Sequence, residues 1–355
     1  AHLEQMLPAV PGEGAFAMAR CIAGGEAEGI GEALKFVPIT PPQKGSNAWI
    51  VGRDRSASGR PILASDPHLE LSLPSIWYLA SLHGPRVQAV GASLPGLPGV
   101  VIGRTPSMAW GLTNGMIDDV DFWIEELDER EYHYKVDGAW RPLHGETQAI
   151  ERRGRGPHLF RMRRTHRGPL LSDAFPGYEG PAISLRMTLH EPTPDMEAFL
   201  GLSRSRTVAE GLAAVRDFGS PAQNLLIADT EGQAAYQLIG NVPIRSHEEH
   251  PVFPRDGTRS DTDWQGYIPF AQLPTLPVGP DEQLVSSNQA IVDGSYPYYL
   301  SHLYEPDYRA LRINALLDGR DGFTTGDMRD IMLDAKSLVA DRFGRFWLEP
   351  HAESG

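Results

Sequence analysis

The peptide bond between Gly45 and Ser46 is the point in this sequence where residue types most clearly suggest catalysis. Ser46 begins an apolar segment, residues 47–52, that has the pattern of a strand. If the bond is cut, the Ser46 hydroxyl becomes a nucleophile and the new α-amine of the same residue becomes its base. An α-amine titrates near ~8, close to physiological pH. The sequence therefore predicts a residue that serves as nucleophile and base after self-cleavage.

Other nucleophile motifs are missing from the sequence. There is no Gly-x-Ser-x-Gly, and none of the four lysines has a serine three residues before it. His-Glu-x-x-His and phosphate-binding loops are also missing. These absences strengthen the case for Ser46.

His68 is a candidate neighbour of Ser46. Residues 47–52 and 61–64 flank a polar turn and are typical of a hairpin. Antiparallel pairing would bring Asp66-Pro67-His68-Leu69 back toward Ser46, where His68 could bond the hydroxyl. The alternative is a loop histidine with a purely structural hydrogen bond.

Two asparagines are candidates for stabilising a developing oxyanion. Asn114 lies in a glycine-bounded turn that could aim a backbone N–H, and Asn224 precedes an apolar strand with its side-chain amide. A tight turn and a turn cap are the alternatives. Arg245 could set a charge near this site or form a surface salt bridge.

The run Asp118-Asp119-Val120-Asp121 offers three carboxylates in four residues. Carboxylate and carbonyl oxygens are the ligands that Ca²⁺ prefers. The spacing is not that of an EF-hand, and a solvated acidic turn is the alternative.

Composition describes an acidic globular chain. Of 355 residues, 41% are hydrophobic and 22% are charged, and the formal charge of −14 argues against a nucleic-acid partner. The one basic cluster, from Arg152 to Arg167, is interpreted as a solvated hairpin face. No apolar run approaches the ~18 residues of a membrane span. Cys21 is the only cysteine, so the chain cannot form an internal disulfide.

The pattern along the chain predicts strands first and helices later. A helix is expected around residues 14–22, and proline-rich sequence leads to Gly45. Strands are expected over 87–92, 99–103, 108–113, 122–127, 132–136, 146–153, 158–164, 182–188, 224–229 and 234–239. Helices are expected over 75–82, 194–203, 207–218, 308–317 and 326–346, with a surface excursion over 243–281. This order favours packed antiparallel sheets with helices outside.

Several motifs in order resemble the penicillin acylase family of N-terminal-nucleophile hydrolases, which includes cephalosporin and acyl-homoserine-lactone acylases. They are Gly45-Ser46-Asn47-Ala48-Trp49, Ser58-Gly59-Arg60-Pro61, Asp66-Pro67-His68-Leu69, Gly91-Ala92-Ser93-Leu94-Pro95-Gly96, Ala109-Trp110-Gly111-Leu112-Thr113, Asp118-Asp119-Val120-Asp121, Gln223-Asn224 and Trp264-Gln265-Gly266. Each is weak alone, and their shared order over residues 45–340 is specific.

The resemblance implies an α+β fold, a four-layer αββα sandwich, and a precursor that cuts itself before Ser46 into an αβ heterodimer. It implies a self-processing serine acylase that hydrolyses the amide between an acyl chain and an amine of β-lactam, homoserine-lactone or lipopeptide type. Ser46 would be the nucleophile, with His68 beside it. Asn114 and Asn224 would form the oxyanion hole, and Arg245 would position Asn224. Asp118, Val120 and Asp121 would be ligands of a structural Ca²⁺, with no organic cofactor.

Two departures from the family pattern matter. Leu69 and Ile102 stand where penicillin G acylases have phenylalanines, so an aliphatic acyl pocket is expected at least as much as a phenylacetyl one. By the resemblance, residues 1–45 would be the end of the α chain with its processing linker, and residues 46–355 the first part of the β chain. A periplasmic or secreted location is implied, although no signal peptide is visible. The alternative function is an uncleaved, inactive precursor or a non-catalytic relative that binds acyl groups.

Overall fold

The computed structural model describes residues 45–69, 71–175, 177–246 and 253–348. These residues form two compact units. The larger unit contains residues 45–117, 193–241 and 268–348, and the smaller contains Asp118–Pro192 and Val242–Tyr267 with the gaps given above. The expected helix near residues 14–22, like all of residues 1–44, lies outside the described residues.

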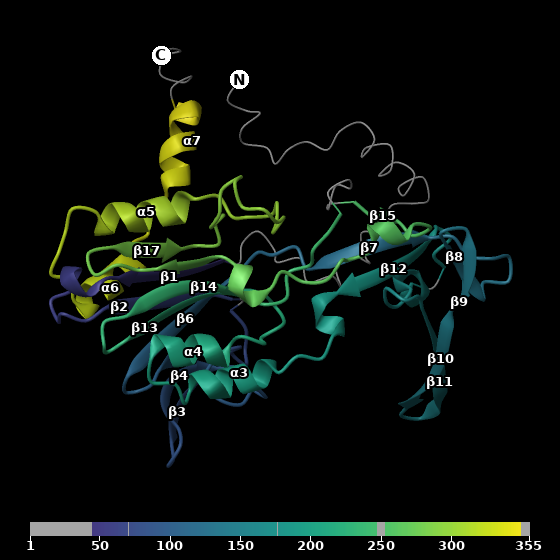
Figure 1. The fold of residues 1–355 in the computed structure, drawn as a ribbon, viewed down its shortest axis with the longest axis horizontal. Helices are drawn as coiled ribbons and strands as arrows, with labels where there is room; N and C mark the ends of the chain where they lie inside the picture. Colours follow the sequence, from purple (N-terminus) through teal and green to yellow (C-terminus); the bar gives the residue numbers. More distant parts are fainter. Residues whose placement is uncertain (1–44, 70, 176, 247–252, 349–355) are drawn as a thin grey trace. The chain divides into compact units, whose positions relative to one another are not determined.

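The larger unit is built on two antiparallel sheets (Figure 1). The three-stranded sheet has the order β17-β1-β2, with β17 (Gln283–Ser286), β1 (Gly45–Val51) and β2 (Ile62–His68). The seven-stranded sheet has the order β16 (Thr275–Pro277), β14 (Ala234–Ile239), β13 (Gln223–Asp229), β6 (Met108–Asn114), β5 (Ile102–Arg104), β4 (Gln88–Ser93) and β3 (Tyr78–His83). The helices are α3 (Asp195–Leu202), α4 (Val208–Ala214), α5 (Tyr308–Leu317), α6 (Thr325–Met332) and α7 (Leu338–Leu348).

Helices cover the outer face of each sheet, which gives the larger unit the expected αββα layering (Figure 1). Helices α5 and α6 bury Ile313 and Ile331 against Trp49 of β1. Helices α3 and α4 bury Phe199 and other apolar side chains against Trp110 of β6. Each sheet therefore has one face on helices and one on the other sheet.

Strand alternation decides which residues lie between the sheets. Trp49 and Val51 of β1 belong to the core under the helices, so Ala48 and Ile50 point the other way. A close approach is required at Gly111 of β6, where a Cβ would lie 2.6 Å from the Ser65 Cβ of β2. Only glycine fits at this contact between the two sheets.

The smaller unit has a three-stranded sheet and two hairpins. The sheet order is β12 (Ala182–Met187), β7 (Val120–Glu125) and β15 (Arg255–Asp256); the hairpins are β8 (His133–Val136) with β9 (Ala139–Pro142) and β10 (His144–Arg152) with β11 (Arg155–Arg164). Short 3-10 turns in the two units are Arg53–Arg55, Leu171–Ala174, Thr188–His190, Ser260–Thr262 and Phe270–Gln272.

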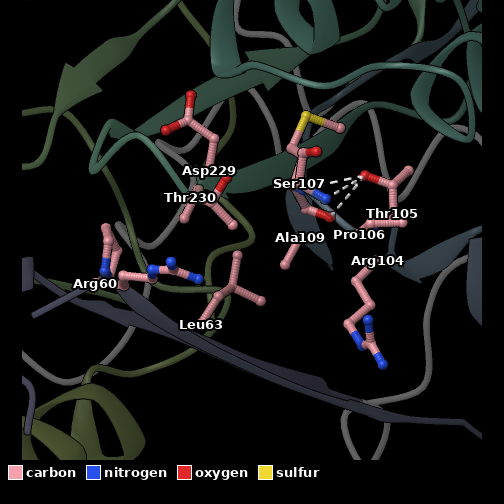
Figure 2. Close-up of a pocket in the computed structure, with 12 residues that line it drawn as sticks. Arg60, Leu63, Arg104, Thr105, Pro106, Ser107, Ala109, Asp229 and Thr230 are labelled. Atoms are coloured by element: carbon pink, nitrogen blue, oxygen red, sulfur yellow. Dashed lines mark hydrogen bonds between the residues drawn. The ribbon is translucent and has the colours of Figure 1, made fainter. Parts of the chain in front are cut away.

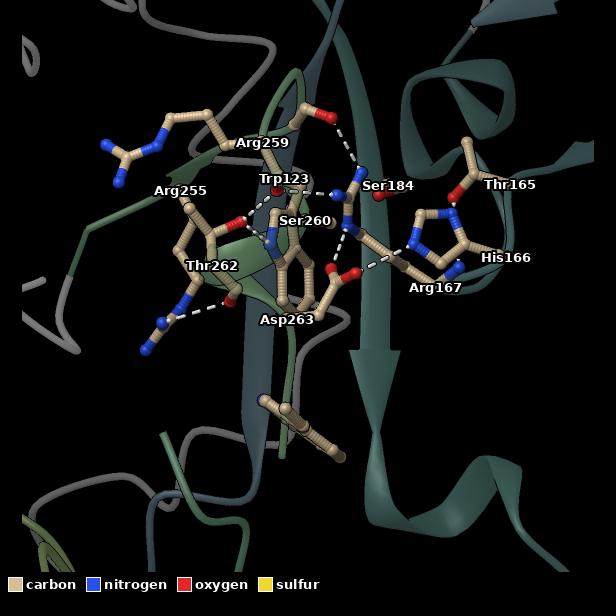
Figure 3. Close-up of polar contacts among 12 residues, drawn as sticks. Trp123, Thr165, His166, Arg167, Ser184, Arg255, Arg259, Ser260, Thr262 and Asp263 are labelled. Atoms are coloured by element: carbon tan, nitrogen blue, oxygen red, sulfur yellow. Dashed lines mark hydrogen bonds and ion pairs between the residues drawn. The ribbon is translucent and has the colours of Figure 1, made fainter. Parts of the chain in front are cut away.

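A network of polar contacts surrounds Arg167 in the smaller unit (Figure 3). The Arg167 side chain is fully buried, donates to both Glu125 oxygens at 3.0–3.1 Å and pairs with Asp263 at 2.5 Å. Its guanidinium lies over the Trp123 ring, 5.5 Å from the centroid. The basic cluster is thus exposed along β10 and much of β11, as expected, but Arg167 is a core residue and the expectation of a solvated face was wrong for it.

Three predicted elements differ from the structure. Residues 75–82 were expected to be helical, but Tyr78–His83 form strand β3, which pairs with β4 along its whole length. The single helix expected over 326–346 is two helices, α6 and α7. The surface excursion over 243–281 contains buried side chains, including Trp264. Among the described residues, no helix combines the length and hydropathy needed to cross a membrane.

Candidate active site

Ser46 lies near the start of β1, on the face that meets the second sheet. It pairs with Pro67, and Gly45 pairs with His68, so the predicted hairpin is confirmed. The residue is 6% exposed. Its backbone nitrogen donates a hydrogen bond of 2.6 Å to Asn288 Oδ1, and no hydrogen bond of its hydroxyl occurs among the described residues. The Ser46 nitrogen is thus held by a side-chain carbonyl oxygen from just beyond β17.

Asn288 connects Ser46 to the second sheet. It follows β17 with a φ of 66°, a left-handed conformation that asparagine tolerates better than most residues. Its Nδ2 donates to the Asn114 carbonyl oxygen at 2.9 Å. Sequence reasoning missed Asn288. The available signal was the polar run Ser286-Ser287-Asn288 at the end of a strand.

Asn224 has a fixed amide orientation. The Tyr236 hydroxyl donates to Asn224 Oδ1 at 2.7 Å, and Asn224 Nδ2 donates to Thr113 Oγ1 at 3.0 Å and to the Asn114 carbonyl at 3.1 Å. Burial raises the pKa of the Tyr236 hydroxyl well above its ordinary value, so it stays a donor. Its hydrogen bond therefore holds the Asn224 nitrogen, rather than the oxygen, toward Asn114.

The Asn114 carbonyl accepts two amide donors, from Asn224 and Asn288. If Asn224 turns one N–H to a substrate oxygen, the carbonyl keeps Asn288 as its partner. Register also orients the Asn114 N–H. Gly115 N–H donates to the Ala222 carbonyl, so Asn114 and Gln223 form a non-hydrogen-bonded pair and the Asn114 N–H points away from β13. Both asparagines thus have an N–H that could serve an oxyanion.

Arg309 of α5 holds the start of strand β1 from the helix side. Its Nη1 donates to the Ser46 carbonyl and to Asn47 Oδ1, both at 2.7 Å. Its Nη2 donates to the Ser287 carbonyl at 2.7 Å and to Asn288 Oδ1 at 3.0 Å. Burial lowers the pKa of Arg309 from its ordinary value, without making deprotonation relevant near neutrality. Nothing in the local sequence distinguished this arginine from other helix-surface arginines.

His68 lies beside Gly45, but its ring has another partner. His68 Nε2 is 2.8 Å from Asp66 Oδ2, and the expected hydrogen bond to the Ser46 hydroxyl is not made. Leu69 follows β2 and is 39% exposed, and Ile102 of β5 packs against the core between the seven-stranded sheet and its helices. The predicted roles of His68, Leu69 and Ile102 stay predictions.

A cavity of about 150 Å³ lies at the opposite ends of the same strands (Figure 2). Arg60 and Leu63 line it beside β2, and Asp229 lines it at the far end of β13 from Asn224. Asp229 accepts hydrogen bonds from the backbone of Val208, Glu231 and Gln233, which marks it as a structural carboxylate. None of the predicted site residues is among the described residues that line this cavity.

The acidic turn and Arg245 come together in the smaller unit. Arg245 Nε donates to Asp121 Oδ2 at 2.8 Å, and its Nη2 donates to the Asp118 carbonyl at 2.6 Å. Asp121 Oδ2 also accepts from Trp264 Nε1 at 2.5 Å, and Arg255 Nε lies 3.5 Å from Asp121 Oδ1. Arg245 is therefore bound to the acidic turn, and its predicted action on Asn224 stays a prediction.

The same contacts test whether the turn fits the predicted calcium ion. Two guanidinium groups and an indole N–H already engage the buried Asp121 carboxylate, and a divalent cation would face both guanidiniums. Within the described part of the chain, no group of three or more His, Cys, Asp or Glu residues is arranged to hold a metal ion. In this arrangement Asp118, Val120 and Asp121 do not fit Ca²⁺.

Comparison with known proteins points to one family. The penicillin amidase family matches residues 3–352. The acyl-homoserine lactone acylase QuiP of Pseudomonas aeruginosa is 30% identical over 317 residues, which is 86% of this chain and 37% of that protein. The penicillin acylase 2 proenzyme of Pseudomonas sp. strain SE83 is 29% identical over 295 residues, covering 82% of this chain and 38% of that protein.

A solved structure has the same fold. The thermostable penicillin G acylase of Alcaligenes faecalis aligns with a TM-score of 0.68 at 23% identity, over 80% of this chain and 51% of that chain. The present chain thus spans less than two fifths of the length of both curated relatives. The family match, by contrast, extends over nearly all of the 355 residues. The chain belongs to the penicillin amidase family.

Proposed function

We propose that the protein is a self-processing acylase whose nucleophile is Ser46 and whose substrates are amides between an acyl chain and an amine. The observation that carries the proposal is the hydrogen-bond path from the Ser46 nitrogen through Asn288 to the Asn114 carbonyl and Asn224. This path supports the proposal because it links the residue proposed as nucleophile to the two residues proposed as oxyanion donors. The names of the two relatives, a homoserine-lactone acylase and a penicillin acylase, support the same reaction class.

The reaction begins only after the Gly45–Ser46 bond is cut, because an amide nitrogen is not a base. The Ser46 hydroxyl then attacks the substrate carbonyl carbon while the α-amine accepts the hydroxyl proton. Asn224 Nδ2 and the Asn114 N–H stabilise the oxyanion. The C–N bond breaks, the leaving amine takes the proton, and the acyl group stays on Ser46 as an ester. Water attacks the ester, which releases the carboxylic acid and restores the hydroxyl.

The substrate class is expected to include aliphatic acyl chains. Leu69 and Ile102 stand where phenylalanines would favour a phenylacetyl group, so a pocket with aliphatic walls should accept a straight chain. Comparing the hydrolysis of decanoyl and phenylacetyl amides tests this directly. A strong preference for phenylacetyl would exclude the aliphatic pocket without affecting the proposed chemistry.

The proposal includes an αβ heterodimer formed by self-cleavage and a periplasmic or secreted location. The second candidate function is an uncleaved precursor or an acyl-binding relative without turnover. This second function is retained because the hydrogen bond from the Ser46 nitrogen to Asn288 can also form in an uncut chain.

Intact-mass measurement of the purified native-length protein distinguishes the two functions. A new N-terminus at Ser46, together with amide hydrolysis, is the expected result. Ser46→Ala should give one uncut chain without turnover, and Ser46→Cys should retain cleavage because a thiol can replace the hydroxyl. An uncut wild-type chain that binds acyl amides would favour the second function.

A further inference from the structure

Gly45 and Arg309 are in unusually close contact. A Cβ built on Gly45 would lie 2.7 Å from Arg309 Nη2, 3.0 Å from Cζ and 3.2 Å from Nη1. Real Cβ atoms essentially never approach a heavy atom to less than 3.0 Å. Any side chain at position 45 therefore requires the Arg309 guanidinium to move.

The guanidinium is not free to move. Its two terminal nitrogens make four hydrogen bonds, two of them to backbone carbonyls and two to asparagine oxygens. Hydrogen bonds from a charged donor are stronger than those between neutral groups. Displacement would break at least the bonds of Nη2, which is the atom closest to the added Cβ.

One of these bonds is shared with the nucleophile. Asn288 Oδ1 accepts from Arg309 Nη2 and from the Ser46 nitrogen. The Ser46 carbonyl is also held by Arg309. A displaced guanidinium would thus release the Ser46 carbonyl and leave Asn288 Oδ1 with the Ser46 N–H as its remaining donor among these residues.

We propose that Arg309 is a positioning residue that selects glycine immediately before the nucleophile and so controls the rate of self-cleavage. This inference rests on the proposed function. In the cleavage step, the Ser46 hydroxyl oxygen attacks the Gly45 carbonyl carbon, the Gly45–Ser46 C–N bond breaks, and the hydroxyl proton ends on the departing nitrogen. Water then hydrolyses the resulting ester, which gives the Gly45 carboxylate, the free hydroxyl and the new α-amine. The bond that breaks ends at the Ser46 nitrogen, whose acceptor Asn288 Oδ1 is also held by Arg309.

The test is a double-mutant cycle on the native-length protein. Gly45→Ala adds the Cβ, and Arg309→Lys removes Nη2 while keeping the charge. The rate of cleavage is followed by intact mass from the first appearance of folded protein. Gly145→Ala is the matched control, because Gly145 is also a strand glycine and has nothing within 4 Å of its built Cβ.

We expect Gly45→Ala to slow cleavage about tenfold or more, which is the loss of one charge-assisted hydrogen bond. The same substitution should have a clearly smaller effect in the Arg309→Lys background, and Gly145→Ala should have none. Cleavage of Gly45→Ala at the wild-type rate, or an equal slowing in both backgrounds, would overturn the inference.

A thermal melt separates this inference from the proposed function. If wild-type protein is never cut, the proposed function fails and the cycle is measured on the uncut chain. Gly45→Ala should then lower the melting temperature more with Arg309 present than in the Arg309→Lys background. Equal shifts in the two backgrounds would mean that Arg309 does not select glycine at position 45.

Discussion

The Tyr236 hydroxyl offers the sharpest test of how the candidate oxyanion donor is oriented. Tyr236→Phe removes the 2.7 Å bond to Asn224 Oδ1 and leaves that oxygen buried without its donor. An unsatisfied buried acceptor costs about 1–3 kcal/mol. Loss of this bond also weakens the hold on the native amide orientation, and a rotated amide would turn its oxygen toward the Asn114 carbonyl and its N–H groups away from the substrate.

The expected fall in kcat is smaller than the fall that loss of a whole oxyanion donor would cause. Loss of a whole oxyanion donor costs about 10²–10³ in kcat. Thr113 and the Asn114 carbonyl still favour the native orientation of Asn224, because both accept from its Nδ2. A residual penalty of about 1–2 kcal/mol corresponds to a fall in kcat of roughly 5- to 30-fold with little change in KM.

The assay is steady-state hydrolysis of a chromogenic decanoyl anilide by processed protein. Tyr134→Phe is the control, because Tyr134 is equally buried and its hydroxyl lies 3.0 Å from His166 Nδ1 in the smaller unit. Both variants should lose stability, and only Tyr236→Phe should lose kcat. An unchanged kcat in Tyr236→Phe, or an equal loss in Tyr134→Phe, would refute the claim that Tyr236 orients the donor.

Three further predictions concern the smaller unit. Arg167→Met should lower the free energy of unfolding by about 3–5 kcal/mol in urea titrations, because it leaves the buried Glu125 carboxylate without its cationic partner. The control variant Arg329→Met breaks an exposed pair with Asp330 and should change the free energy of unfolding by less than about 1 kcal/mol. Burial raises the pKa of Asp119. The contribution of this carboxyl group to folding stability is therefore full below the ordinary carboxyl pKa and is lost as pH rises through the elevated pKa. Asp119→Asn should raise the melting temperature at pH 7.5, and this gain should disappear toward pH 4. Removing calcium with a chelator should leave the melting temperature unchanged, because guanidinium groups already neutralise Asp121, and a fall of several degrees would show that the turn binds calcium after all.

Local patterns predicted much of the larger unit. The β1–β2 hairpin and the β13–β14 hairpin follow from apolar runs that flank polar turns, and the pairing of Gly45 with His68 follows from the first of them. Asn224 stood out because a polar residue opens a fully apolar strand. Asn114 stood out because glycines bound its turn. These features depend on neighbours in sequence, which is why the sequence alone could indicate them.

The remaining site residues depend on contacts that local sequence does not encode. Asn288 and Arg309 reach Ser46 from more than 240 positions away along the chain. Tyr236 reads as an ordinary buried strand residue until its hydroxyl is seen to meet Asn224. The strand at Tyr78–His83 was taken for a helix because its short apolar run fits both periods, and only its pairing with β4 decides between them.

Strand β1 packs against the outer helices with one face and against the second sheet with the other. This limits which substitutions in the outer helices the protein can accept. Trp49 sits on one face of the strand and donates from Nε1 to the Met328 sulfur of α6 at 3.0 Å, while Ser46 lies on the opposite face. Oxidation of Met328 would place a polar sulfoxide under the strand that carries Ser46. Substitutions in the outer helices that aim at resistance to heat or oxidants should therefore keep the position of Trp49, because the same strand carries Ser46.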